Sequence, residues 1–304
     1  MAQLVSILAW SAMHLSDSGH PWAEIADAAT SDASERVQQS LREWETTKRN
    51  GQPSPPGKDE ELLAGLALLS EIEICRGSTQ NWYTPLKLAQ RIIRGMGGPA
   101  KLQNLTGNVL WVLKNITYHE LLSSTTSIDG PALEPEEYGA ILAGGINSFM
   151  GCCQPIFCII AEISRLSVES GRCITFADRD ARIESLRILA AKESRIKARL
   201  DQCYPSFSFS PETSSASSYH FVTFRAWVLT ARLYLRQVVS HCNAHSLVSQ
   251  LLMSQLLESV SLVIGTPAES SLLFPIFIAV SLWVPPPNCA LAPGSMLILP
   301  ILTL

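Results

Sequence analysis

The sequence has few charged residues, no marked excess of either sign and little to suggest a nucleic-acid-binding surface. Charged residues make up 16% of the 304 residues and the formal net charge is −4, whereas about 25% of an average globular protein is charged. A DNA-binding module normally carries a clear positive excess, so we expect this chain alone to bind DNA poorly. The 47% of hydrophobic residues excludes a mostly disordered chain, because burying them offsets the loss of chain entropy.

No segment has the features of a membrane span or a secretion signal. The apolar stretch at 271–284 contains Pro275 and stops at three consecutive prolines. It is shorter than the roughly 20 residues that a membrane-spanning helix needs. The start of the chain has neither a basic segment nor a small-residue cleavage pattern. We therefore expect no membrane association.

The cysteines predict a reducing compartment and no disulfide framework. The chain has eight of them, and no Cys-x-x-Cys pair occurs. Most lie in apolar, helical-looking runs rather than in a small loop-rich frame. Cys152, Cys153 and Cys158 form a cluster that is compatible with metal binding, but their apolar surroundings favour a role as small core hydrophobes.

A second set of metal-binding residue types lies at His241, Cys242 and His245. The two histidines are one turn apart if the helix continues through them, a geometry that can bind zinc. No further ligand is identifiable elsewhere in the sequence, so we interpret them as a helix-end pair. We predict no metal site in this chain.

Motifs for catalysis are also missing. His119-Glu120 begins like a zinc-protease motif, but Ser123 stands where the second histidine is required. The sequence contains no GxSxG, no GxxxxGK[ST] and no DDxxD. We predict no catalytic residues and no enzyme activity, and cofactor-binding residues stay unknown. The alternative is an all-helical enzyme of secondary metabolism with a buried apolar pocket.

Helical periodicity dominates the chain, and no run of alternating strand residues stands out. The predicted fold class is all-α: a single large domain of antiparallel packed helices at 1–284, followed by an irregular apolar tail at 285–304. Mobile loops are expected near 50–58 and 204–218. The expected helices are 3–15, 20–48, 59–75, 85–95, 103–122, 136–150, 153–169, 177–201, 219–242, 246–264 and 268–283.

The helix expected at 219–242 has the clearest amphipathic pattern. A buried stripe is predicted from apolar residues that step by three and four, namely Phe221, Phe224, Val228, Ala231, Leu235 and Val238. Another face carries Arg225, Arg232 and Arg236, which we interpret as solvated arginines rather than a phosphate-binding stripe. Four tryptophans are candidates for a pocket but are better interpreted as core residues: Trp82, Trp111, Trp227 and Trp283.

Five segments, in this order, resemble the fungal-specific transcription factor domain, the regulatory region of fungal zinc binuclear cluster transcription factors. They are LAWSAMHLS at 8–16, LALLSEIEICRG at 66–77 with Trp82 and Leu86 after it, YHELLSST at 118–125 with the stretch 142–166 that contains Gly151 and Pro155, FRAWVLTARLYLR at 224–236, and SLLFPIFIA at 271–279. The resemblance covers about residues 3–283. It implies an all-α regulatory domain in the nucleus.

The sequence departs from the family pattern at several points. Ser78, Pro85 and Leu88 replace the family's Asp, His and Gly, and Thr84-Pro85 is typical of a helix N-cap and first helical residue. The family's six-cysteine zinc cluster is absent, so zinc and DNA contact are expected only from a missing module. The tail after Val284 departs from the family pattern as well, which leaves a truncated, non-functional gene product as another alternative.

The resemblance implies a domain that regulates RNA polymerase II transcription by responding to a ligand or a partner. The expected partners are co-regulator proteins or a small effector, and the domain is a possible homodimer. Such a domain changes activity by shifting between helix packings, and the energy for the shift comes from differential binding to those states.

Overall fold

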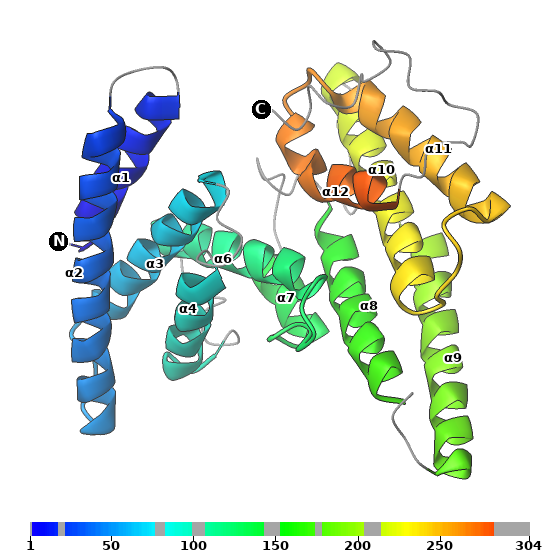
Figure 1. Cartoon of the computed structure of the whole chain (residues 1–304), viewed down its shortest axis with the longest axis horizontal. Helices are drawn as coiled ribbons and strands as arrows, with labels where there is room; N and C mark the ends of the chain where they lie inside the picture. The colour runs from blue at the N-terminus through cyan, green and yellow to red at the C-terminus, as the bar shows by residue number, and fades with distance from the viewer. Residues whose placement is uncertain are drawn as a thin grey trace. The chain divides into compact units, whose positions relative to one another are not determined.

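A computed structural model of the chain describes residues 2–17, 22–76, 83–98, 107–142, 153–173, 178–203 and 214–282. In these ranges the chain forms α-helices, one 3-10 helix and connecting loops, without a β-strand (Figure 1). The all-α prediction is therefore confirmed. No helix in the described ranges has the length and apolar character that crossing a bilayer requires. The predicted tail at 285–304 lies outside the described residues.

The chain divides into two compact units. The first unit comprises residues 1–146 and 153–196, and the second comprises residues 147–152 and 197–304. The predicted limits of a regulatory domain at 1–284, and the predicted mobility near 50–58, stay predictions. Of the loop predicted at 204–218, residues 204–213 lie outside the described residues, and 214–218 are helical, as the start of α10 (Ser214–Val238), which corrects that part of the prediction.

The first unit contains seven complete helices and most of an eighth among the residues that the structure describes. They are α1 (Ala2–Asp17), α2 (Ala23–Arg49), α3 (Lys58–Cys75), α4 (Tyr83–Gly95), α6 (Asn108–Ser124), α7 (Pro135–Leu142), α8 (Gln154–Cys173) and α9 (Arg179–Asp201), whose last five residues belong to the second unit.

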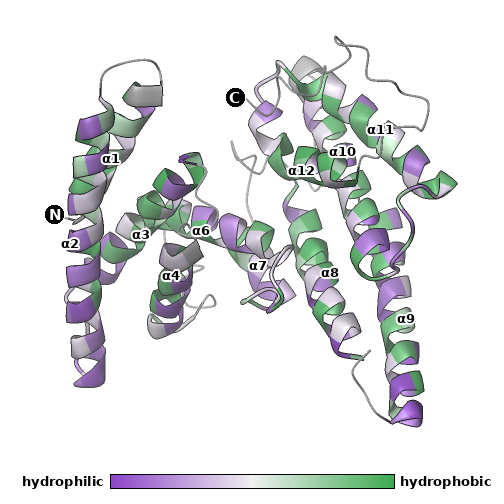
Figure 2. Ribbon diagram, in the orientation of Figure 1, coloured by the Kyte–Doolittle hydropathy of each residue, from purple (hydrophilic) through white to green (hydrophobic). Residues whose placement is uncertain are grey.

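Helix α3 lies at the centre of the first unit, against α1, α2, α4 and α6. Its apolar residues are buried on several sides, including Leu62, Leu63 and Leu66. Gly65 lets α3 approach α2 closely, because a Cβ atom at this position would lie 2.9 Å from Val37 Cγ2. Helix α2 is hydrophilic over much of its length (Figure 2) and buries only a narrow stripe toward the core. This stripe keeps a helical spacing of three and four residues.

The second unit is built around α10 (Ser214–Val238), with α11 (Leu247–Val263) and α12 (Leu273–Leu282) packed against it. A short 3-10 helix, η2 (Glu269–Leu272), leads into α12. Trp227 on α10 is fully buried, and its ring centroid lies 5.6 Å from that of Phe274. The Trp227 Nε1–H donates a hydrogen bond of 2.8 Å to the Ser271 carbonyl. A single aromatic side chain therefore joins α10 to both η2 and α12.

Several predicted helix limits differ from those observed, and two of the differences have a clear local cause. Helix α4 begins at Tyr83, so Pro85 lies inside the first turn, where its missing N–H costs no intrahelical hydrogen bond. Helix α10 ends at Val238, although the prediction continued it to 242. No Gly or Pro marks this end. It is closed instead by the Ser240 N–H, which donates to the Leu235 carbonyl at 3.2 Å.

The predicted buried stripe of α10 is partly correct. Phe224, Ala231 and Leu235 are buried, and Val228 and Val238 are half-buried. Phe221 is 52% exposed, which corrects its assignment to the core. The stripe is broader than predicted because α11, η2 and α12 all contact α10, and their contacts also bury residues beside the stripe, such as Trp227 and Leu233.

Candidate functional site

A buried polar cluster joins α6 to the loop and helix that follow it. Glu120 on α6 is only 3% exposed. One carboxylate oxygen accepts a hydrogen bond of 2.8 Å from the Ala132 N–H, and the other accepts from the Tyr138 hydroxyl on α7. We call these three residues the Glu120 cluster. Both carboxylate oxygens therefore accept a hydrogen bond, and the cluster ties α6 to the loop before α7 and to α7 itself.

Two arginines support the same loop from outside. Arg94 donates to the Ala132 carbonyl at 3.0 Å, and Arg165 donates to the Leu133 carbonyl at 2.8 Å and pairs with Glu134. Burial raises the pKa of the Glu120 carboxyl above its usual value, although the hydrogen bonds from Tyr138 and Ala132 and the two cations oppose the shift. Burial and the adjacent carboxyl also raise the pKa of the Tyr138 hydroxyl.

The side chains of His119 and Glu120, the start of the incomplete protease motif, have different partners in the structure. His119 Nε2 lies 2.6 Å from a Glu71 oxygen on α3, whereas Glu120 is held in the Glu120 cluster. The two side chains take part in separate interactions and do not converge on a common site. Sequence reasoning considered His119-Glu120 only as a motif and missed the structural role of Glu120.

The candidate metal ligands are not assembled into a site among the described residues. His241, Cys242 and His245 lie in the loop after α10, so the histidine pair does not have the helical spacing considered for it. His241 has a φ of 47°, in the left-handed region. Within the described parts of the chain, no three His, Cys, Asp or Glu side chains are placed to hold a metal ion. The absence of metal from the whole chain stays a prediction.

The cysteine cluster is partly described. Cys153 is fully buried at the start of α8, and Cys158 is half-buried. A Cβ atom at Gly139 would lie 2.7 Å from Cys158 Sγ, so Cys158 packs closely against α7. This position is the one expected of a small core hydrophobe. Cys152 lies outside the described residues.

The four tryptophans do not line one pocket. Trp227 belongs to the core of the second unit, as predicted, but Trp111 on α6 is 47% exposed. The prediction of Trp111 as a core residue is wrong: Trp111 lies in the first turn of α6, whereas Asn115 and Tyr118, on the same side further along the helix, are buried. Trp82 and Trp283 lie outside the described residues.

A groove in the first unit lies among α2, α3 and α4. Its floor is apolar and buried, formed by Val37, Leu66 and Leu69. Gln38 and Glu73 add polar groups at its sides. The groove holds about 300 Å³, which is at the lower end of the range for small-molecule sites, roughly 300–1,000 Å³. We call it the α2–α4 groove, and it is the candidate effector site of the first unit.

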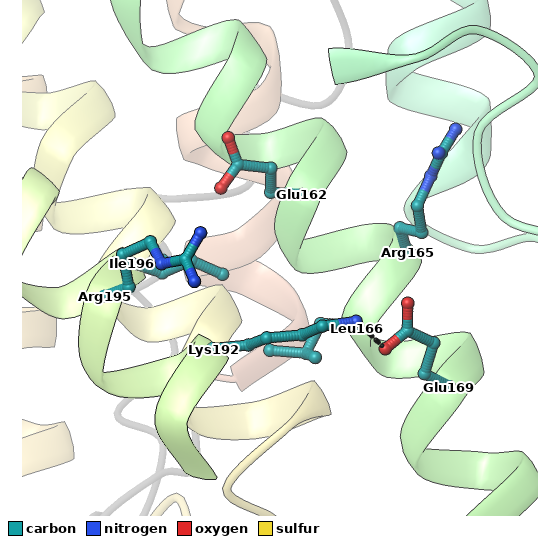
Figure 3. A pocket seen from close by; sticks show the side chains of 7 residues that line it. All are labelled: Glu162, Arg165, Leu166, Glu169, Lys192, Arg195 and Ile196. Atoms are coloured by element: carbon teal, nitrogen blue, oxygen red, sulfur yellow. Dashed lines mark hydrogen bonds and ion pairs between the residues drawn. The ribbon is translucent and has the colours of Figure 1, made fainter. Parts of the chain in front are cut away.

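A smaller, more highly charged pocket lies between α8 and α9 in the same unit (Figure 3). Lys192 and Glu169 pair across it at 2.6 Å, while Arg165 extends away from Arg195 toward the loop before α7. The pocket holds about 160 Å³, which is below the usual range for small-molecule sites. The Lys192–Glu169 pair links the two helices across it.

The described residues form an all-α fold and include no group of three His, Cys, Asp or Glu side chains placed to hold a metal ion. The chain belongs to the fungal specific transcription factor domain family, whose family model matches residues 2–287. The resemblance seen in the sequence is therefore confirmed. No solved structure matches the chain.

Two curated relatives are transcriptional regulators. The chain is 27% identical over 223 residues to an uncharacterized transcriptional regulatory protein of Schizosaccharomyces pombe. This alignment covers 71% of this chain and 42% of the relative. The chain is 21% identical over 315 residues to the transcriptional activator protein UGA3 of Saccharomyces cerevisiae. That alignment covers 90% of this chain and 57% of the relative. The chain thus spans about half the length of these relatives.

Proposed function

We propose that this chain is the regulatory domain of a nuclear transcription factor that controls RNA polymerase II transcription. The observation that carries the proposal is the family match, which extends over nearly the whole chain. The names of the two relatives, a transcriptional regulatory protein and a transcriptional activator, support the same role. A family of regulators favours this function over the alternative of an all-helical enzyme.

In this proposal the domain does not contact DNA itself. Its formal net charge of −4 and its lack of any Cys-x-x-Cys pair are unsuited to a DNA-binding zinc cluster. Contact with DNA and the bound zinc would come from a zinc cluster outside these 304 residues. The domain would then set how strongly the bound factor activates or represses.

The α2–α4 groove is the proposed site of a small effector. An apolar floor with a few polar groups at the sides is the usual composition of a small-molecule site. The Glu73 carboxylate would favour an effector with a positively charged or hydrogen-bonding end. An effector bound here would stabilise one packing of α2, α3 and α4, which is how binding energy is converted into a change of state.

A reporter assay in yeast tests the proposed function. The chain is fused to a heterologous DNA-binding module, and transcription from the matching promoter is compared with that of the module alone. We expect a severalfold change in either direction. A Trp227→Ala fusion is the control that disrupts the fold. A wild-type fusion that is folded and nuclear but leaves transcription unchanged would overturn the proposal.

A thermal-shift screen of small metabolites tests the effector site. A ligand at 100 times its Kd stabilises the folded protein by about 2.7 kcal/mol. An effector of the α2–α4 groove should raise the melting temperature of the wild type and have much less effect on Leu88→Trp, which fills the groove from its side. An effector whose stabilisation is the same in both proteins would place its site elsewhere.

A further inference from the structure

The second unit carries a basic pocket that none of the functions above uses. Its cations come from two helices: Lys197 near the end of α9, and Arg232 and Arg236 on α10. Asp201 is the one carboxylate that lines it. The pocket holds about 250 Å³ and is bounded on the third side by α11. Its lining therefore combines a surplus of positive charge with an apolar wall.

The arginines are held in place by their own contacts. Arg232 pairs with Asp201 at 2.6 Å. Arg236 donates to the hydroxyls of Ser246 at 3.2 Å and Ser249 at 3.3 Å, at the start of α11. Hydroxyl partners do not neutralise the Arg236 charge, and the positive end of the α11 dipole lies beside it. Arg232 and Arg236 are thus half-buried and held by these contacts, whereas Arg225 is exposed, and the interpretation of the three as a solvated face stays a prediction.

Apolar residues on α11 extend the pocket over the protein surface. Leu247, Val248 and Leu251 are 84%, 51% and 57% exposed, and Leu252 lines the pocket beside Val248. We call these four residues the α11 patch. Contiguous exposed apolar residues of this kind are typical of interaction sites. Because the four residues extend the apolar wall of the pocket along about one and a half turns of α11, the patch suits the side of a helix better than a small molecule.

We propose that the α11 patch and the basic pocket bind an amphipathic acidic helix of a co-regulator protein. The apolar face of such a helix would lie on the α11 patch, with one side chain anchored in the pocket, as in other helix-in-groove complexes. Its carboxylates would lie toward Lys197 and Arg236. The proposal rests on the proposed regulatory function, because it names the class of partner that the domain recruits.

The test is a binding titration with a model peptide, followed by fluorescence anisotropy. The peptide has about 18 residues, or five helical turns, with leucine at positions i, i+3, i+4 and i+7 and glutamate on its flanks. A second peptide has lysine in place of every glutamate. We expect the full chain to bind the acidic peptide and not the basic one. Binding should weaken as salt rises from about 0.05 M to about 0.5 M.

Matched variants separate the patch from other exposed leucines and cations. Leu251→Ser should weaken binding of the acidic peptide about tenfold or more, whereas Leu273→Ser, which alters a 59% exposed leucine on α12, should not. Lys197→Glu should weaken binding too. Arg179→Glu, which alters the other end of α9 about 27 Å away, should not. All four positions are exposed, so the variants are expected to keep the circular dichroism spectrum of the wild type.

Three results would overturn the inference: no binding of either peptide, equal binding of both, or equal losses in Leu251→Ser and Leu273→Ser. The reporter fusion distinguishes this failure from failure of the proposed function. If the wild-type fusion changes transcription but the chain binds no acidic peptide, the function stands and the docking site is wrong. If the wild-type fusion leaves transcription unchanged, the proposed function fails whatever the peptides do.

Discussion

Both units have an apolar core, but the buried contact that joins their elements most closely differs in kind. In the first unit, the loop before α7 is fixed by the buried Glu120 cluster, in which a carboxyl group joins a backbone N–H and a tyrosine hydroxyl. In the second unit, the helices around Trp227 are held by aromatic packing with a single polar bond to Ser271. The strength of a buried hydrogen bond to a carboxyl group depends on its geometry and on whether the carboxyl is protonated, whereas the stability from apolar packing is largely independent of pH. The two units should therefore respond differently to mutation and to pH.

The largest effect is expected from Trp227→Ala. Removing a fully buried aromatic side chain leaves a cavity and should lower the free energy of unfolding by about 3–5 kcal/mol. Hydrogen exchange of peptides from α10 to α12 should speed up, as measured by mass spectrometry. Phe221→Ala on the same helix is the control, because Phe221 is 52% exposed and should cost less than about 1 kcal/mol. Equal costs for the two variants would contradict this packing.

A smaller effect is expected from Glu120→Ala. It leaves the Ala132 N–H and the Tyr138 hydroxyl without their acceptor and should cost about 1–3 kcal/mol in urea denaturation. Glu120→Gln keeps an acceptor oxygen for the Ala132 N–H and an amide group beside the Tyr138 hydroxyl. It should therefore retain most of the stability that Glu120→Ala loses. If Gln were as harmful as Ala, hydrogen bonding would not be the source of the stability.

The pH dependence of the Glu120 cluster has a definite sign. Because burial raises the folded-state pKa of Glu120 above its ordinary value of 4.5, the folded state binds more protons than the unfolded state in the interval between the two values. Stability from this group is thus present below pH 4.5 and is lost as pH rises through the folded-state pKa. As pH rises through this interval, the melting temperature of the wild type should fall relative to that of Glu120→Gln. A rise would contradict the raised pKa.

The smallest effect is expected at the pair between Lys192 and Glu169. Both side chains are partly exposed, at 44% and 36%, and surface ion pairs contribute about 0–1 kcal/mol. Lys192→Ala should therefore change urea stability much less than Glu120→Ala in the same unit. A comparable loss would show that the charged pocket between α8 and α9 is a major support of the first unit.

Features set by local sequence were the most predictable. The all-α class follows from apolar periodicity, which a helix expresses within a few turns. The end of α10 was missed because no Gly or Pro follows Val238 and the helix is closed by backbone hydrogen bonds. Trp111 was placed in the core because residue type favours burial, but it lies in the first turn of α6, where the packing that buries Tyr118 on the same side does not reach it.

Features that join distant residues were not predictable from spacing. Glu120 and Tyr138 are 18 residues apart, and the one signal in the sequence is a single acidic residue on the apolar helix around it. The basic pocket combines Lys197, Arg232 and Val248 from three helices. The arginine spacing on α10 was visible in the sequence, but only the packing of α9 and α11 against these arginines shows which of them share a pocket.

The most direct test of the regulatory role is the reporter measurement on three fusions: wild type, Leu251→Ser and Leu273→Ser. We predict that the wild-type and Leu273→Ser fusions change transcription severalfold and equally relative to the DNA-binding module alone, and that Leu251→Ser loses most of the change. A folded, nuclear wild-type fusion that leaves transcription at the level of the module alone would contradict the regulatory role.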